Sequence, residues 1–332
     1  MAVTLKDIAE QIGVSNQAVS AVLNSKTNCR VSKEKRARIL KLARDLNYQA
    51  NMSASILRGR RSKLIGIFVD SFARYRTLRL LQEIERLSSK RGYRIVTSFT
   101  HDNIAHMKAD YLQFQRYGIS DFICCAHDYP EFREEIADLF TGAENVVFME
   151  KPCLPGMPYV RTSRVTAMTA MIADACRKGF RRFGNLYGHH AVQTEYMQRD
   201  EFKQALRNNG LDVDENLMFE FPKKRDVDYR IRQAVKKMIL PYRPDFLYVD
   251  DFPYTITLRT QLEETGRKIM IHGGNGDPLF RSIKLNTFDP RYEKIAENLL
   301  DLLLHPELRT TVPVIEAIYK KENGKNVPRQ KK

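Results

Sequence analysis

Several residue types and patterns that mark common protein classes are scarce or absent in this 332-residue chain. It has no tryptophan, so no indole ring is available to stack on a ligand. No apolar run approaches the ~20 residues that a membrane-spanning helix needs. Lys6, Asp7 and Glu10 lie where a signal peptide would have its apolar segment. The chain is therefore expected to be a globular, cytoplasmic protein with no membrane partner.

The five cysteines have neither the spacing of a metal site nor that of a disulfide framework. Cys124 and Cys125 are adjacent in an expected strand and would face opposite sides of a sheet. We therefore expect the five cysteines to be free thiols in a reducing compartment. The sequence also contains no nucleophile–base set, metal-ligand cluster or cofactor-binding loop. We expect no enzymatic activity, no catalytic residue, no bound metal and no cofactor.

The stretch from Thr4 to Asn24 has the spacing of a helix-turn-helix. A small residue, Ala9, lets a second helix approach closely, and Gly13 can adopt positive φ in the turn without steric cost. Val19 can fill the space between the two helices. The apolar face of the first helix recurs at helical spacing, at Leu5, Ile8, Ala9 and Ile12. An ordinary helical hairpin is the alternative interpretation of so short a pattern.

Capping residues mark the starts of these helices. Thr4 and Asp7 have the spacing of a capping box, and Ser15 can cap the second helix. Asn16 and Gln17 are then exposed in its first turn, where a recognition helix meets base edges. Side-chain amides suit this task because they can contact adenine through two hydrogen bonds.

A third helix is expected at 33–46, between Val31 and Tyr48, which could close a small core. One face of this helix is strongly basic. Residues 1–62 contain twelve basic and four acidic residues, a net charge of +8 out of +15 for the whole chain. A basic run can be simply a solvated face, but this imbalance favours a surface that binds a polyanion.

The segment Asn51–Arg61 continues this pattern. Asn51 can cap a helix that is too short to persist alone in water. Leu57 precedes Arg58 and has no evident core to enter, so it is a candidate wedge for the minor groove, where such side chains kink the duplex. A plain linker with an incidental leucine is the alternative.

Taken together, these motifs resemble the DNA-binding headpiece of the lactose/galactose repressor (LacI/GalR) family. The matching pieces are TLKDIAEQIGVS, the LNY at 46–48, and Asn51, Ala54 and Leu57. The resemblance implies a homodimer that binds operator DNA, with two departures: Ala21 replaces the usual arginine and Ala50 the usual proline. The expected DNA-binding residues are Thr4, Leu5, Ser15, Asn16, Gln17, Ser20, Asn24, Asn51, Ala54, Leu57 and Arg58.

After residue 62, apolar runs alternate with amphipathic segments, a pattern typical of a parallel sheet covered on both faces. Helices are expected at 74–91, 103–117, 131–140, 165–178, 192–209, 226–239, 253–265 and 291–304, and strands at 64–69, 93–99, 119–126, 145–149, 182–187, 216–221, 245–250, 268–272 and 312–319.

The expected fold is an all-α helix-turn-helix headpiece with a hinge helix, followed by a two-lobed α/β domain like a periplasmic binding protein. We assign residues 1–61 to the headpiece, with the hinge helix at about 51–59. Residues 62–319 form the effector-binding and dimerisation domain, and 320–332 a basic tail. The lobes are expected at about 63–160 plus 290–315, and 161–289 plus the final strand.

Candidate effector-binding residues lie where such folds bind ligands, at the carboxyl ends of strands between the lobes. Asp70 lies just past one expected strand and Asp250 at the end of another, and both can accept hydrogen bonds from hydroxyls, although each could instead be a loop or capping residue. By resemblance, Arg199 clamps an effector, with a surface arginine as the alternative, and Asn275 replaces the usual effector aspartate.

The same resemblance places ring-stacking residues at Phe72, Tyr75 and Tyr187, which could equally be core aromatics. His189 and His190 lack a carboxylate or cysteine partner, so a structural role is favoured over a metal site. The family resemblance favours a sugar or sugar phosphate as effector, and less strongly a nucleobase-like ligand.

The sequence therefore predicts a nucleoid-associated regulator, a repressor that binds a pseudo-palindromic operator as a homodimer. A small sugar-like molecule between the lobes would control its affinity for DNA. The alternative is a DNA-binding regulator or architectural protein whose degenerate cleft holds no ligand.

Overall fold

The computed structural model describes residues 3–23, 31–48, 62–69, 75–100, 103–125, 133–141, 143, 145–188, 198–222 and 226–320. The chain forms two compact units, Met1–Ser62 and Lys63–Lys332. Within the described ranges no helix is long and apolar enough to cross a membrane. The same ranges contain no group of three or more His, Cys, Asp or Glu side chains that could hold a metal ion.

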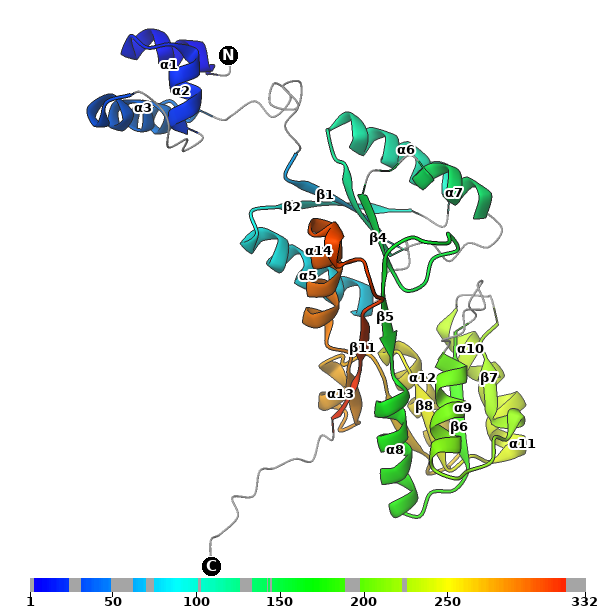
Figure 1. The fold of residues 1–332 in the computed structure, drawn as a ribbon. Coiled ribbons are helices and arrows are strands. Elements are labelled where there is room, and N and C mark those ends of the chain that lie inside the picture. The colour runs from blue at the N-terminus through cyan, green and yellow to red at the C-terminus, as the bar shows by residue number, and fades with distance from the viewer. Residues whose placement is uncertain are drawn as a thin grey trace, which may run out of the picture. The chain divides into compact units, whose positions relative to one another are not determined.

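The described residues of the first unit form the helices α1 (Leu5–Ile12), α2 (Asn16–Leu23) and α3 (Lys33–Asp45) (Figure 1). Gly13 ends α1 in the left-handed conformation, with φ 71°. The predicted face of α1 is confirmed, and Val31 and Tyr48 pack against the small core as expected. That core contains Ile8, Ala9, Val19, Val22, Ile39 and Ala43.

A six-stranded parallel sheet organises the first lobe of the second unit, in the order β11-β5-β4-β3-β1-β2. Strands β4, β3 and β1 are nearly continuous apolar runs because both of their faces are covered. Their bounds are β1 (Leu64–Val69), β2 (Arg94–Phe99), β3 (Asp121–Cys125), β4 (Asn145–Met149), β5 (Tyr159–Ser163) and β11 (Val314–Glu316).

Two helices cover each face of this sheet (Figure 1). Helices α5 (Tyr75–Lys90) and α14 (Tyr292–Leu304) pack on one face, and α6 (Ile104–Arg116) and α7 (Arg133–Thr141) on the other. Cys124 and Cys125 belong to the two opposite clusters, as their adjacency in a strand predicts. Both are free thiols.

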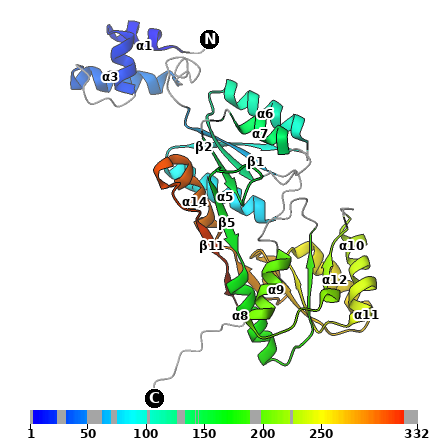
Figure 2. The ribbon, with the colours of Figure 1, turned by 45° about the vertical axis from the view of Figure 1, so that its right-hand side comes forward.

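The second lobe has a four-stranded parallel sheet, ordered β7-β6-β8-β9. Helices α8 and α9 pack on one face, and α10 and α12 on the other (Figure 2). The elements are β6 (Phe183–Tyr187), β7 (Met218–Glu220), β8 (Phe246–Val249), β9 (Met270–Gly273), α8 (Val165–Arg177), α9 (Gln198–Asn208), α10 (Val227–Ala234), α11 (Leu240–Tyr242), α12 (Phe252–Glu264) and α13 (Leu279–Ser282).

The chain passes between the two sheets three times. It leaves the first sheet at the end of β5 and enters α8, and returns after β10 (Thr287–Asp289) into α14. The third passage runs from β11 to β12 (Ile318–Lys320), which pairs antiparallel with β10. The carboxyl end of β5 therefore lies at the junction of the lobes (Figure 2).

The structure corrects several expected elements. Strand β5 was not expected, because its polar residues break up any apolar run. The strand at 216–221 is a 3-10 turn at Glu215–Leu217 followed by the short β7. The helix at 226–239 includes a π-helical stretch, Val235–Ile239, before α11. The last strand is two, β11 and β12. Part of the helix expected at 192–209 lies outside the described residues.

Candidate functional site

The first turn of α2 presents polar side chains to solvent. Ser15 caps the helix, because its Oγ accepts a hydrogen bond of 3.2 Å from the main-chain N–H of Ala18. Asn16 and Gln17 follow it and are exposed. Neither amide makes a hydrogen bond with any residue that the structure describes, so both are available to an external partner. Ser20, one turn later, is half-buried.

The start of α1 is fixed by the predicted capping box. The main-chain N–H of Thr4 donates to Asp7 Oδ2 at 2.7 Å, and the Thr4 Oγ1 accepts from the main-chain N–H of Asp7. These contacts with the main chain and hydroxyl of Thr4 lower the pKa of Asp7. Leu5, an expected DNA-binding residue, is half-buried and packs against the core.

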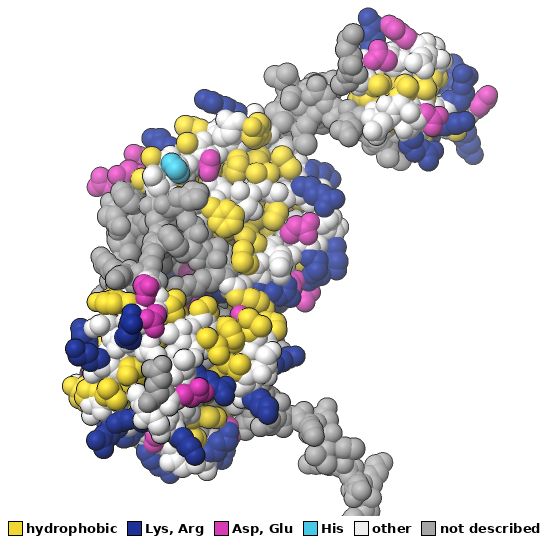
Figure 3. Space-filling view, turned by 180° about the vertical axis from the view of Figure 1, so that it is seen from behind, with side chains coloured by type: hydrophobic (Ala, Val, Ile, Leu, Met, Phe, Trp, Pro, Cys, Tyr) yellow, Lys and Arg dark blue, Asp and Glu magenta, His cyan; other side chains and the backbone are white. Residues whose placement is uncertain are grey.

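Helix α3 carries the basic surface of the headpiece, and Figure 3 shows Lys and Arg side chains gathered along one side of this unit. Ser32 Oγ caps this helix by accepting from the main-chain N–H of Lys35. Within the described part of the headpiece, Lys33, Lys35, Arg38 and Lys41 form no ion pair. Their positive charge is therefore not neutralised locally.

Several predicted site residues lie outside the described residues. In the DNA-binding set these are Asn24, Asn51, Ala54, Leu57 and Arg58. In the effector set they are Asp70 and Phe72, and the histidine pair His189 and His190 also lies outside.

Two predicted cleft residues, Arg199 and Tyr187, lie together. Tyr187 is buried at the end of β6 and interacts electrostatically with Arg199 at the start of α9. Burial raises the pKa of the Tyr187 hydroxyl. The Arg199 Nε donates to Asp200 Oδ1 at 3.1 Å. The preceding residue, Gln198, is the buried one, and its amide donates to Asn185 Oδ1 at 3.1 Å.

Asp250, predicted as the last residue of a strand, directly follows β8 and has a specific partner. The Tyr248 hydroxyl donates to Asp250 Oδ1 at 2.6 Å. Gly274 is required at this place, because a Cβ there would collide with the Asp250 carboxylate and the Tyr248 hydroxyl. The glycines after β9 thus allow the backbone to approach this pair closely.

Asn275 and Tyr75 are held mainly by neighbouring protein groups. The side-chain amide of Asn275 donates to Asp251 Oδ1 at 2.6 Å, and the main-chain carbonyl of Asn275 accepts from the Tyr292 hydroxyl at 2.7 Å. Tyr75 packs edge-on against Tyr292, with ring centroids 6.4 Å apart. Tyr75 thus contributes to the core of the first lobe.

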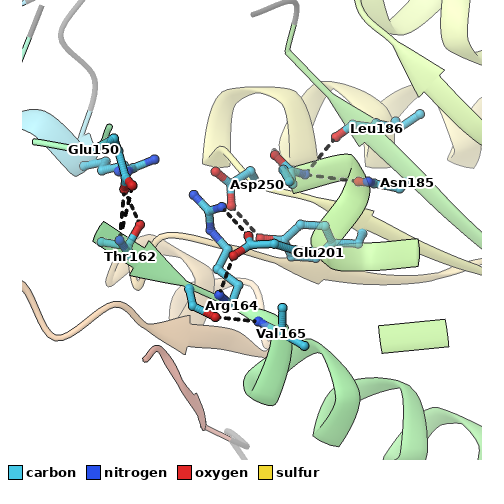
Figure 4. Close-up of polar contacts among 12 residues, drawn as sticks. Glu150, Thr162, Arg164, Val165, Asn185, Leu186, Glu201 and Asp250 are labelled. Atoms are coloured by element: carbon cyan, nitrogen blue, oxygen red, sulfur yellow. Dashed lines mark hydrogen bonds and ion pairs between the residues drawn. The ribbon is translucent and has the colours of Figure 1, made fainter. Parts of the chain in front are cut away.

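Sequence reasoning missed a buried ion pair, Arg164 and Glu201. Arg164 directly follows β5, where the chain crosses between the lobes. Its main-chain N–H donates to Glu201 Oε1, and its Nη1 donates to Oε2, both at 2.9 Å. Figure 4 shows the Asp250 carboxylate beside this guanidinium. Burial raises the pKa of Glu201, and Arg164 opposes that shift.

A second polar group, centred on Glu150, was also missed. Its carboxylate accepts hydrogen bonds from the main-chain N–H and the hydroxyl of Thr162 (Figure 4). Arg76, on α5, lies 3.4 Å from the same carboxylate. Arg76, Thr162, Arg164 and Asn275 line one pocket at the junction of the lobes. No sequence signal pointed to this site, because β5, the strand that positions Arg164, was itself not expected.

Comparison with known proteins identifies the headpiece and the fold. Residues 4–51 match a family described as bacterial regulatory proteins, lacI family. The sucrose operon repressor of Klebsiella pneumoniae is 29% identical over 63% of this chain and 62% of its own length, so the match spans under two thirds of that relative. The sucrose operon repressor of Lactococcus lactis subsp. lactis is 23% identical, over 91% of this chain and 92% of its own length.

Solved structures show the same architecture along nearly the whole chain. A lac repressor dimer, bound to operator and the anti-inducer ONPF, superposes with a TM-score of 0.79. The match is 17% identical and covers 97% of this chain and 99% of the other. The helical headpiece followed by a two-lobed α/β domain is thus a lac repressor-like fold, as predicted.

Proposed function

Since residues 4–51 match the lacI family of bacterial regulatory proteins, we propose that this chain is a sequence-specific DNA-binding transcriptional regulator. It acts as a homodimeric repressor in the cytoplasm, associated with the nucleoid. The observation that carries this proposal is the first turn of α2, where the amides of Asn16 and Gln17 are exposed and make no hydrogen bond with the described residues. Amides so placed can read adenine in the major groove.

The basic face of α3 supports the same function. Lys33, Lys35, Arg38 and Lys41, which form no ion pair with the described residues, can attract phosphates, and counterions are released when such side chains bind DNA. Phosphate contacts supply affinity and orientation, whereas base contacts supply sequence choice. Leu57, with Arg58 after it, is proposed as the minor-groove wedge. In that role, Leu57→Ala would abolish bending of the operator and leave the fold intact.

The second unit would regulate DNA binding through a small molecule held between the lobes. A ligand that contacts both sheets favours one arrangement of the lobes, and its differential affinity couples to the DNA-binding state. We assign effector contacts to Asp70, Phe72, Tyr75, Tyr187, Arg199, Asp250 and Asn275, with a sugar-like ligand as the first candidate. A sucrose operon repressor among the relatives supports that ligand class.

Selection from a random pool of DNA duplexes, using the purified full-length chain, tests the DNA-binding proposal. We expect enrichment of one pseudo-palindromic motif. The double variant Asn16→Ala/Gln17→Ala should lose about tenfold or more of its discrimination between this motif and random DNA. Gln204→Ala, which removes an exposed amide on α9, is the matched control and should change nothing. Enrichment without a shared motif would contradict sequence-specific regulation.

The effector assignment is tested on the same motif. Arg199→Ala should abolish the response of DNA binding to the active metabolite while leaving DNA binding itself intact. A normal response in this variant would reject the role of Arg199. If no class of metabolite changes DNA binding by the wild-type chain, the alternative of an architectural protein with a ligand-free cleft is favoured.

A further inference from the structure

The arginines that the structure describes around the cleft each have a carboxylate of their own. Arg164 pairs with Glu201, Arg76 with Glu150 and Arg199 with Asp200. The Arg164–Glu201 pair is the most deeply buried of these three, with side-chain exposures of 15% and 3%. It also has the most complete geometry, because both carboxylate oxygens accept a hydrogen bond from Arg164.

A further carboxylate lies beside this pair. Asp250 is oriented by the Tyr248 hydroxyl and interacts electrostatically with the Arg164 guanidinium (Figure 4). Burial alone would lower the pKa of Arg164, but the opposite charges of Asp250 and Glu201 outweigh that effect and raise it. One guanidinium therefore faces two carboxylates, which leaves a surplus of negative charge at this place.

The neighbours of Arg164 oppose the binding of an anion there. A phosphate or carboxylate binds an arginine best through two parallel hydrogen bonds. The Arg164 guanidinium gives Glu201 one hydrogen bond, through Nη1, so an anion on its other N–H groups would lie close to the buried Glu201 carboxylate, which would repel it. The nearby Asp250 would repel the incoming anion as well. Hydroxyl groups avoid both costs, because they can accept from arginine N–H groups and donate to Asp250.

From this arrangement we infer that the Arg164–Glu201 pair is a specificity determinant that restricts the cleft to ligands without negative charge. The ligand class is a neutral or cationic polyhydroxylated molecule, and sugar phosphates and carboxylates are excluded. Glu201 acts through Arg164 as a positioning residue. This inference rests on the proposed function, since it describes the ligand of the same cleft.

Glu201→Gln tests the inference, because it removes the charge of Glu201 and preserves its size. Calorimetric titration of the full-length chain would use inorganic phosphate and glucose 6-phosphate as probes. The variant should bind both about tenfold or more tightly than the wild-type chain, since the repulsion from Glu201 is removed and the guanidinium can form charge-assisted hydrogen bonds with the anion. Glu263→Gln makes the same change at an exposed ion pair with Arg259 on α12, and should leave anion binding unchanged.

The double variant Arg164→Gln/Glu201→Gln separates this site from phosphate binding elsewhere, for example on the basic headpiece. It should return anion affinity to the wild-type value, and it tests the inference even if the single variant folds poorly. If Glu201→Gln folds poorly, the wild-type chain and Arg164→Gln are titrated with glucose 6-phosphate instead. Binding by the wild-type chain that is lost in Arg164→Gln would show that the cleft accepts an anion, and would overturn the inference. Equal anion affinity in folded wild-type and Glu201→Gln proteins would also overturn it.

Binding of the selected operator by the same variants keeps this test separate from the proposed function. If the chain binds no specific DNA sequence, the regulator proposal is refuted. The calorimetric comparison of anion affinity between the wild-type chain and Glu201→Gln still decides whether the pair excludes anions.

Discussion

Charged side chains are arranged differently in the headpiece and in the cleft between the lobes. Lys6 and Glu10 on α1 form an ion pair of 3.7 Å with side chains 72% and 65% exposed, and the lysines of α3 have no acidic partner among the described residues. In the cleft, Arg164 and Glu201 pair at 2.9 Å and are largely buried. A surface for a polyanion needs available positive charge, whereas a buried site must neutralise its charges from within.

Removing the glutamate of the buried pair and that of the exposed pair tests this contrast. The loss of the buried glutamate is expected to have the largest effect on stability. Glu201→Ala leaves Arg164 buried without its partner and should lower the free energy of unfolding by about 3 kcal/mol or more. Glu10→Ala in the headpiece removes an exposed pair and should change it by about 0.5 kcal/mol at most. Urea denaturation followed by circular dichroism measures both. Equal losses would remove the distinction between the two regions.

Acid pH should act on the second unit before the headpiece. His272, on β9, is fully enclosed, and burial lowers its pKa from 6.5 to about 3. Below pH 6.5, His272 binds a proton in the unfolded chain but stays neutral in the folded chain. The free energy of unfolding therefore falls by about 1.4 kcal/mol for each pH unit below 6.5. At pH 5 the loss should reach about 2 kcal/mol. It continues until the pH approaches 3, where the folded form also protonates.

Urea titrations at pH 7 and pH 5 check this dependence. His272→Phe fills the same aromatic cluster without a titratable group and should reduce the loss by about 2 kcal/mol. In the headpiece, hydrogen bonds lower the pKa of Asp7 from 3.8, so its contribution is retained at pH 5 and lost only at lower pH. An unchanged acid sensitivity in His272→Phe would show that other groups cause it.

The headpiece should instead be sensitive to its caps. Thr4→Ala removes the hydroxyl that accepts from the main-chain N–H of Asp7 and should cost about 1 kcal/mol of headpiece stability. Thr4→Ser retains that oxygen and should lose little. Thermal unfolding of the two variants, followed by circular dichroism, measures the difference. The cap would have no energetic role if alanine and serine behaved alike.

The smallest effect is expected from single lysines of α3. Lys41→Ala should weaken binding to all DNA sequences to a similar extent and reduce the salt dependence of log K by about 0.9 if the lysine contacts one phosphate. Lys294→Ala on α14 removes a lysine that pairs with Glu297 and should leave the slope unchanged. Fluorescence anisotropy over a series of salt concentrations measures the slopes. A change of sequence preference in Lys41→Ala would indicate a base contact instead.

The sequence predicted the headpiece well because its signals are local. The capping box at Thr4 and Asp7, the turn at Gly13 and the apolar spacing of α1 all act within a few residues. Most strands of the second unit were predicted from apolar runs in the same way. Strand β5 was missed because Arg161 and Thr162 interrupt its apolar character, and Pro158 precedes it.

The cleft was less predictable because its contacts are tertiary. Arg164 and Glu201 are 37 residues apart, and nothing local reveals that the first residue after β5 meets the start of α9. The same helix shows a further limit of sequence patterns. Gln198 and Arg199 are adjacent, yet only the structure shows that Gln198 is buried while Arg199 is partly exposed.

Genome-wide mapping of the DNA sites that this chain occupies in its host cell tests the central claim most directly. The account predicts a small number of sharp peaks that share one pseudo-palindromic motif, placed upstream of transport or catabolic operons. Asn16→Ala/Gln17→Ala should erase those peaks. Broad occupancy without a shared motif, unchanged in this variant, would contradict a sequence-specific regulator and favour an architectural DNA-binding protein.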